Sequence, residues 1–168
     1  GKAHWIQWHI QPITDENGQV VELQAIGHDI TQLKRTEESL RESEFFLQKS
    51  QTVGRVGSYY FDVCNSSWID SPMLDEIFGI DDSFPKDTAG WLSLVHPDEQ
   101  AEMSHYFSQY VLTERNRFEK EYRIIRRSDQ QERWVYGLGE LEFDEQGNPA
   151  RMIGTIQDIT ERKQMEQD

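Results

Sequence analysis

The sequence has a single cysteine, a deficit of basic residues and no long hydrophobic run. That cysteine, Cys64, excludes an internal disulfide and a cysteine-rich zinc site, and it fits a reducing compartment. The 17 basic residues are outnumbered by 31 acidic ones, for a net charge of -14, so a surface for nucleic acid or anionic lipid is not expected. No apolar stretch approaches the ~20 residues of a membrane span, and no signal peptide opens the chain.

These absences predict a soluble, cytoplasmic segment without direct membrane contact, and they leave open a membrane tether elsewhere in a longer protein. The chain is nevertheless rich enough in apolar residues to form a core. Of its 168 residues 36% are hydrophobic, including 5 Trp, 6 Tyr and 8 Phe. This composition indicates a globular chain and not a disordered acidic tail.

An internal repeat organises the chain. A shift of 129 positions places Trp5 on Trp134, and Asp15-Glu16, Gly18, Asp29-Ile30-Thr31, Lys34 and Glu37 then also meet identical residues without a gap. Each copy predicts a strand, a glycine-closed turn, a second strand and Asp-Ile-Thr before a charged helix. We expect residues 1–30 to be the C-terminal hairpin of one unit (strands 4–13 and 19–29), residues 53–160 a complete second unit, and residues 161–168 the start of an exit helix.

Residues 31–52 have the composition of a linker helix, which Gly54 and Gly57 are expected to end. Three leucines recur every seven residues, as in a coiled-coil seam: Leu33, Leu40 and Leu47. The seam is weak because polar residues occupy the other core positions. The helix could lie on its own domain, but we favour a homodimer that pairs through the helices flanking the complete unit.

The second unit has the pattern of an α+β domain. Strands are expected over 58–63, 67–70, 117–127, 132–143 and 149–159, with short helices over 71–95 and a longer helix from Pro97 to about Glu114. Gly79, Pro85 and Gly90 are expected to break the short helices. The short connections favour one antiparallel sheet with helices on one face, preceded by an N-terminal β-hairpin and the linker helix.

An ordered set of motifs in this unit resembles the PAS domain with its C-terminal PAC segment. Each motif is weak alone, but together they occur in order from Gly57 to Lys163. They are Trp91, Val95-His96-Pro97-Asp98, Phe118 with Glu121-Tyr122-Arg123-Ile124, Arg133-Trp134-Val135, Asp144 with Gly147, and Gly154 with Asp158-Ile159-Thr160-Glu161-Arg162-Lys163. One departure is Ser128-Asp129-Gln130, where the family usually places a glycine in the turn.

The resemblance implies a five-stranded antiparallel sheet that cups helices around a small cavity, in a repeated unit of bacterial sensor proteins. It also implies adjacent PAS domains and an output domain, typically a histidine kinase of a two-component system or a diguanylate cyclase, in the same protein.

The cavity is the candidate ligand site. Side-chain alternation and aromatic content select seven residues around it: Tyr60, Trp68, Phe78, Trp91, Tyr122, Met152 and Ile156. Two interpretations stay open, a filled core or an apolar pocket for a small molecule.

No cofactor is expected. Flavin-binding relatives use a cysteine motif that is absent around Cys64, and haem-binding relatives use a helical histidine, for which His105 is the candidate here. A lone histidine is more often a surface residue, and no second histidine or cysteine lies at metal-ligand spacing. No nucleophile, phosphate loop or pair of catalytic carboxylates can be assembled either. The fragment is therefore not expected to be an enzyme.

The favoured function is a signal-sensing and relay module, in which a change in the core reaches the exit helix through Asp158, Ile159 and Thr160. Either Thr160 or Asp158 could cap that helix. The alternative is a ligand-free dimerisation spacer that transmits only helix register.

Overall fold

The computed structural model describes residues 3–167, which form two compact units divided between Lys49 and Ser50. The first unit contains strands β1 (Ile6–Thr14) and β2 (Val20–Asp29), followed by helix α1 (Thr31–Gly54), which continues into the second unit. The hairpin and the linker helix agree with the sequence expectation. No helix among the described residues combines the length and the apolar character that a membrane crossing requires.

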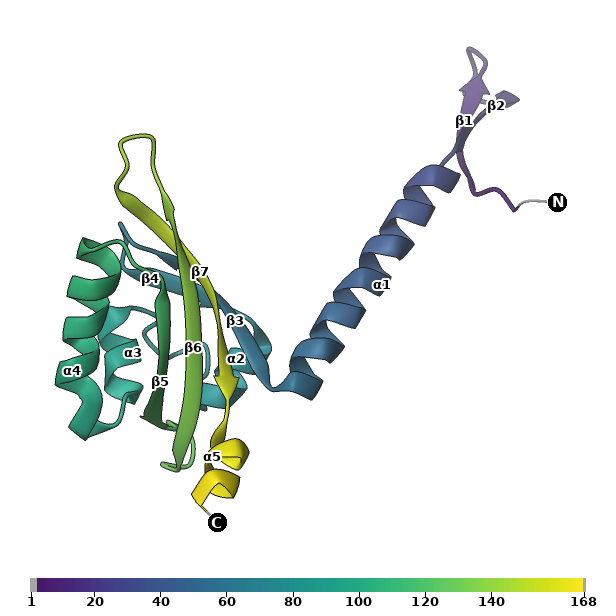
Figure 1. Ribbon diagram of the computed structural model, residues 1–168. Helices are drawn as coiled ribbons and strands as arrows, with labels where there is room; N and C mark the ends of the chain where they lie inside the picture. Colours follow the sequence, from purple (N-terminus) through teal and green to yellow (C-terminus); the bar gives the residue numbers. More distant parts are fainter. Residues whose placement is uncertain (1–2, 168) are drawn as a thin grey trace. The chain divides into compact units, whose positions relative to one another are not determined.

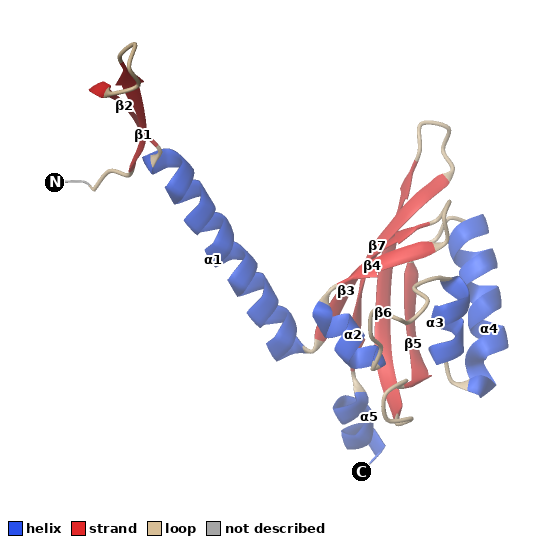
Figure 2. Cartoon of the chain, turned by 180° about the vertical axis from the view of Figure 1, so that it is seen from behind, coloured by secondary structure: helices blue, strands red, loops and turns tan. Residues whose placement is uncertain are grey.

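The second unit is built on a five-stranded antiparallel sheet (Figure 1). Its strands are β3 (Val56–Asp62), β4 (Ser67–Asp70), β5 (Phe118–Ile125), β6 (Glu132–Phe143) and β7 (Pro149–Asp158), in the spatial order β4-β3-β7-β6-β5. The helical segments between β4 and β5 lie against one face of the sheet, as Figure 2 shows from behind. The α+β architecture expected from the sequence is therefore confirmed.

These helical segments are short. They comprise α2 (Pro72–Phe78), α3 (Thr88–Leu94), a 3₁₀ turn (Pro97–Glu99) and α4 (Gln100–His105), which continues as a π-helical segment (Tyr106–Thr113). After β7, the last strand of the sheet, the chain forms helix α5 (Thr160–Gln167). Side chains from the helices and from the inner face of the sheet form one buried core, with Leu74, Val111 and Val135 among its fully buried members.

Two glycines do not have the role in ending helices that was expected of them. Helix α1 does end at Gly54, as expected, but the left-handed residue after it is Arg55 (φ 49°), and Gly57 belongs to β3. A Cβ atom at Gly57 would lie 2.6 Å from Leu74 Cα, so the missing side chain lets α2 approach the sheet. Gly90 does not break a helix: it lies in the first turn of α3, where its N–H donates to the Asp87 carboxylate over 2.7 Å.

The unusual turn Ser128-Asp129-Gln130 closes without glycine. Gln130 takes the left-handed conformation itself, with φ 58°. The Gln131 N–H donates to the Asp129 carboxylate over 3.1 Å, and the Gln130 N–H donates to the Arg126 carbonyl over 2.9 Å. Local hydrogen bonds thus hold a backbone conformation for which a glycine has the lower steric cost.

The two copies of the repeat fold alike. The β1–β2 and β6–β7 hairpins pair in the same register, with the same irregularity near the turn, and Gly18 and Gly147 have φ values of 78° and 81°. In the first copy Trp5 N–H donates to Thr31 Oγ1 over 2.9 Å, and in the second Trp134 N–H donates to Thr160 Oγ1 over 3.0 Å. The shared residues therefore specify a shared hydrogen-bond pattern.

The inner faces of the two hairpins differ in one reciprocal way. In the first copy Trp8 stands opposite Gly27, and in the second Gly137 stands opposite Ile156. The Trp8 ring lies 3.0 Å from the position of a Cβ atom at Gly27, so the large side chain fills the space that the glycine leaves. Each hairpin thus pairs one large residue with one glycine. The glycine lies on the second strand in the first copy and on the first strand in the second copy.

The first hairpin also exposes side chains that its counterpart buries. Ile6 and Leu23 are 43% and 66% exposed, whereas the equivalent Val135 and Met152 are 0% and 5% exposed. An exposed apolar hairpin is marginal in water, and we expect this one to pack against further protein.

Candidate functional site

The core of the second unit contains a cavity of about 60 Å³. It lies between the inner face of the sheet and the helices, and its lining is almost wholly apolar. The lining residues are Tyr59, Phe61, Trp68, Leu74, Phe78, Thr88, Trp91, Phe107, Phe118, Tyr122, Met152 and Ile156. None of these side chains carries a charge at neutral pH, so the cavity suits a small uncharged molecule.

Six of the seven cavity candidates line it: Trp68, Phe78, Trp91, Tyr122, Met152 and Ile156. The placement of Tyr60 was wrong. Tyr60 is on β3 between Tyr59 and Phe61, and because side chains alternate along a strand it faces away from the cavity, where Arg151 lies 3.4 Å from its hydroxyl. The sequence interpretation therefore chose the wrong one of two adjacent tyrosines.

Tyr59 crosses the inner face of the sheet over two glycines. Its O–H donates to the Leu138 carbonyl over 3.0 Å. A Cβ atom at Gly139 or Gly154 would lie 2.4 or 2.5 Å from the Tyr59 hydroxyl, so only glycine at both positions leaves room for it. Burial raises the pKa of Tyr59 well above its usual range, and the side chain stays neutral.

A group of aromatic rings forms another part of the cavity lining. Trp91 makes edge-to-face contacts with Phe107, Phe118 and Tyr122 at centroid distances of 5.4, 6.0 and 6.2 Å. The Trp91 indole N–H donates to the Tyr122 hydroxyl over 3.1 Å. Burial raises the pKa of Tyr122, so its hydroxyl is a neutral polar group beside an apolar space.

A charged cluster supports the cavity wall at Trp68. The Trp68 indole N–H donates to one Asp70 oxygen over 2.9 Å, and Lys86 Nζ donates to the other over 2.5 Å and to Asp75 over 2.8 Å. Burial raises the pKa of Asp70, while the hydrogen bonds from Lys86 and Trp68 act in the opposite direction. The cluster fixes the indole of Trp68 and joins the segment around Lys86 to β4 and α2.

The candidate relay residues join β7 to α5. One carboxylate oxygen of Asp158 accepts the Thr160 N–H over 3.0 Å and thereby caps the helix, and the other accepts from Arg55 over 3.1 Å. The Ile159 N–H donates to the Trp134 carbonyl over 2.9 Å, and its side chain is 4% exposed. Of the two capping residues considered from the sequence, Asp158 makes the cap and Thr160 bonds to β6.

Arg55 is a site residue that the sequence interpretation missed. Its guanidinium pairs with Asp158, and its carbonyl accepts the Asp158 N–H over 3.1 Å. Asp158 thus contacts Arg55, which directly follows α1 in the sequence, and Thr160, which begins α5. No sequence signal connects two residues that lie 103 positions apart.

The remaining candidates lie outside the cavity. Cys64 is exposed in the β3–β4 turn, and His105 is exposed at the end of α4. Within residues 3–167 no group of three or more potential metal ligands comes together. The seam residues Leu33, Leu40 and Leu47 are 55%, 59% and 58% exposed on α1.

Comparisons with known proteins agree on the fold. A family profile described as PAS fold matches residues 71–156. A sensory box histidine kinase/response regulator from Burkholderia thailandensis has 27% identity and a TM-score of 0.59, covering 72% of this chain and 89% of that one. The N-terminal domain of a diguanylate cyclase with a PAS/PAC sensor, from Marinobacter aquaeolei, has 19% identity and a TM-score of 0.58, covering 64% of this chain and 98% of that one.

A curated relative matches nearly the whole sequence. It is a methyl sulfide methyltransferase-associated sensor from Methanosarcina acetivorans, which is 24% identical over 172 residues that include 99% of this chain. The chain spans 9% and 17% of the lengths of the curated relatives that it matches.

Neither cofactor considered from the sequence fits the described residues. A light-oxygen-voltage domain studied with a flavin analogue shares the fold at 14% identity and a TM-score of 0.54. The present cavity of about 60 Å³ is far smaller than the several hundred Å³ typical of pockets for larger ligands, and Cys64 does not line it. His105 does not line it either, so it cannot ligate a haem iron there.

Proposed function

Because this chain belongs to the PAS fold family, whose modules sense signals and do not themselves catalyse reactions, we propose that residues 50–168 detect a signal in the cavity and relay it to α5. The observation that carries this proposal is that one strand, β7, contributes both to the cavity and to the start of α5. Met152 and Ile156 of β7 line the cavity, and β7 ends in Asp158, which caps α5. A change in the cavity can therefore reach the exit helix through a short stretch of strand.

The cavity favours a small, neutral ligand. Its volume of about 60 Å³ accommodates only a few non-hydrogen atoms, and the polar N–H and O–H groups of its lining side chains belong to Thr88, two tryptophans (Trp68 and Trp91) and the two tyrosines. A charged ligand would lose its hydration without gaining an ionic partner there.

The test is recovery of the ligand. The protein is purified from its own source at native expression, its absorbance is recorded, and an organic extract is analysed by mass spectrometry. A small molecule at near-stoichiometric amount supports the proposal. A colourless sample whose extract matches the solvent control counts against a resident ligand and favours the spacer function.

We assign the relay role to Asp158, Ile159 and Thr160, and the output to a domain elsewhere in the full protein. The histidine kinase and diguanylate cyclase among the similar structures make these two output types the natural candidates. The matching hydrogen-bond pattern of the two hairpins supports the further assignment of residues 1–30 to a preceding unit of the same kind.

A dimerisation spacer is the second candidate function, because the leucine seam on α1 is exposed. Replacing Leu40 and Leu47 together by Glu is expected to convert a dimer to a monomer, since like charges would then face each other across the seam. Light scattering after size exclusion measures the mass. The control adds the same charge off the seam, as Gln32→Glu with Ser39→Glu, and should remain a dimer. Monomeric protein before any substitution would contradict the seam.

A further inference from the structure

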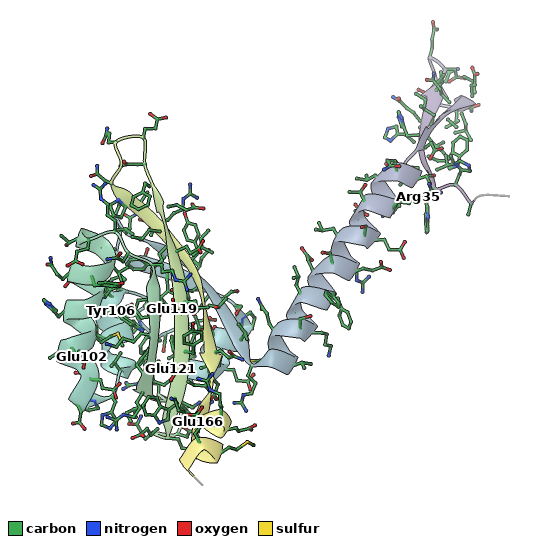
Figure 3. All side chains as sticks on the ribbon, viewed as in Figure 1. Arg35, Glu102, Tyr106, Glu119, Glu121 and Glu166 are labelled. Atoms are coloured by element: carbon green, nitrogen blue, oxygen red, sulfur yellow. The ribbon has the colours of Figure 1, made fainter. Side chains whose placement is uncertain are left out.

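Helix α5 is attached to the sheet at a second place besides Asp158. Glu121 lies on β5, on the face of the sheet away from the cavity, and its carboxylate receives hydrogen bonds from Arg162 and Lys163 of α5. The Lys163 Nζ to Glu121 Oε2 distance is 2.6 Å. Figure 3 labels Glu121 and, on α5, Glu166.

The attachment has more than one component. Lys163 Nζ also lies 5.2 Å from the centroid of the Trp134 ring on β6 and 3.5 Å from Glu166. Glu166 in turn lies 3.7 Å from Arg162. The hydrogen bond from Lys163 lowers the pKa of Glu121, which keeps the carboxylate charged at neutral pH. A network of this kind holds a side chain in place better than an isolated surface pair does.

The position of Glu121 in β5 connects this attachment to the cavity. Its neighbour along the strand is Tyr122, which is fully buried and lines the cavity on the opposite face of the sheet. Because adjacent residues of a strand share one peptide unit, a shift of Tyr122 moves the backbone that carries Glu121. The Asp158 cap, by contrast, is reached through β7.

We propose that Glu121 is a positioning residue that couples the Tyr122 side of the cavity to α5 through Arg162 and Lys163. The proposal deepens the sensing function and rests on it, and it defines a route to the exit helix separate from the Asp158 junction. The two routes use different strands, so each can be interrupted alone.

The first test measures the attachment itself. In the 15N- and 13C-labelled chain, Glu121→Gln is expected to lower the helix population of residues 162–166, seen in the Cα shifts, and to speed exchange of their amide protons about threefold to fivefold. Lys163→Gln should act in the same direction, and the double variant should lose less than the sum of the two single losses, because both substitutions break the Lys163–Glu121 contact. The matched control is Glu119→Gln, because Glu119 lies on the same face of β5 but pairs with Arg117 and Tyr136. Unchanged α5 signals in Glu121→Gln overturn the proposal.

The second test asks whether the attachment carries a signal. Xenon serves as the probe because it occupies dry apolar cavities. Under xenon pressure the Trp91 indole resonance is expected to shift in the wild type and in both variants, while the α5 resonances shift in the wild type and Glu119→Gln and lose most of that shift in Glu121→Gln. A merely structural role would leave the transmitted shift intact, and that result overturns the coupling. If Trp91 does not respond, the cavity itself fails as the input, whereas the first test still decides the attachment.

Discussion

Gly154→Ala is expected to lower the free energy of unfolding by about 3 kcal/mol, at the upper end of overpacking costs. The new Cβ atom would lie 2.0 Å from the Leu138 carbonyl oxygen, as well as 2.5 Å from the Tyr59 hydroxyl. A backbone carbonyl in the middle of a sheet cannot turn aside, so the strands themselves must separate. Urea unfolding followed by tryptophan fluorescence measures the loss.

Gly139→Ala is the comparison that shows whether a backbone atom or a side chain causes the loss of stability. Its Cβ atom would meet only side chains, the Tyr59 hydroxyl at 2.4 Å and the Met152 sulfur at 2.9 Å. We expect a loss of about 1 kcal/mol, because flexible side chains can move. Adding Tyr59→Phe should recover part of the loss at position 139 and almost none at position 154. Equal recovery at both positions would show that Tyr59, and not the backbone, limits the space at Gly154.

Asp158→Ala is expected to leave the domain folded but to uncouple output in the full-length protein. The substitution removes the cap of α5 and the partner of Arg55 at once, and the Asp158 side chain is 5% exposed. Loss of the cap and of one charge-assisted hydrogen bond together costs about 2 kcal/mol. Thermal unfolding measures the stability, and autophosphorylation or cyclic dinucleotide synthesis measures the output, according to the domain present.

Asp158→Asn separates the two contacts. The amide oxygen can still accept the Thr160 N–H, but the charge opposite Arg55, and opposite Arg133 at 3.9 Å, is gone. If the cap transmits the signal, Asn restores most of the output; if the ionic contacts to Arg55 and Arg133 transmit it, Asn behaves like Ala. Full signalling in the Ala variant would refute the assigned role of Asp158.

The sequence predicted which residues line the cavity better than it predicted how much space each side chain has. Hydrophobic alternation and the motif resemblance identified six lining residues, because the inner face of a strand follows from its period of two. The choice of Tyr60 over Tyr59 failed because both strand faces near β3 carry aromatic residues. Tyr59 differs from Tyr60 because its side chain occupies the space that the missing Cβ atoms of Gly139 and Gly154 leave. These glycines lie on β6 and β7, far from Tyr59 in the sequence.

Local chemistry likewise predicted the hairpins, their turns and the α5 cap, since these depend on residues close in sequence. Arg55 and Glu121 escaped prediction because each acts on a partner that only the closed sheet brings near, Asp158 and Lys163. Helix α1 ends at Gly54, as expected, but the sequence did not indicate that Arg55 would adopt the positive φ that glycine usually supplies.

The reciprocal exchange of large residue and glycine has a consequence for how the repeat can evolve. The two hairpins share register and turn, so a genetic crossover within the hairpin would join strands that pair correctly. Yet joining β1 to β7 would set Trp8 against Ile156, and joining β6 to β2 would set Gly137 against Gly27. One recombinant would be overfilled and the other would contain a void. The swapped positions of the large residue and the glycine thus act against recombination between the two hairpins. The duplicated hairpins can therefore diverge without being merged again.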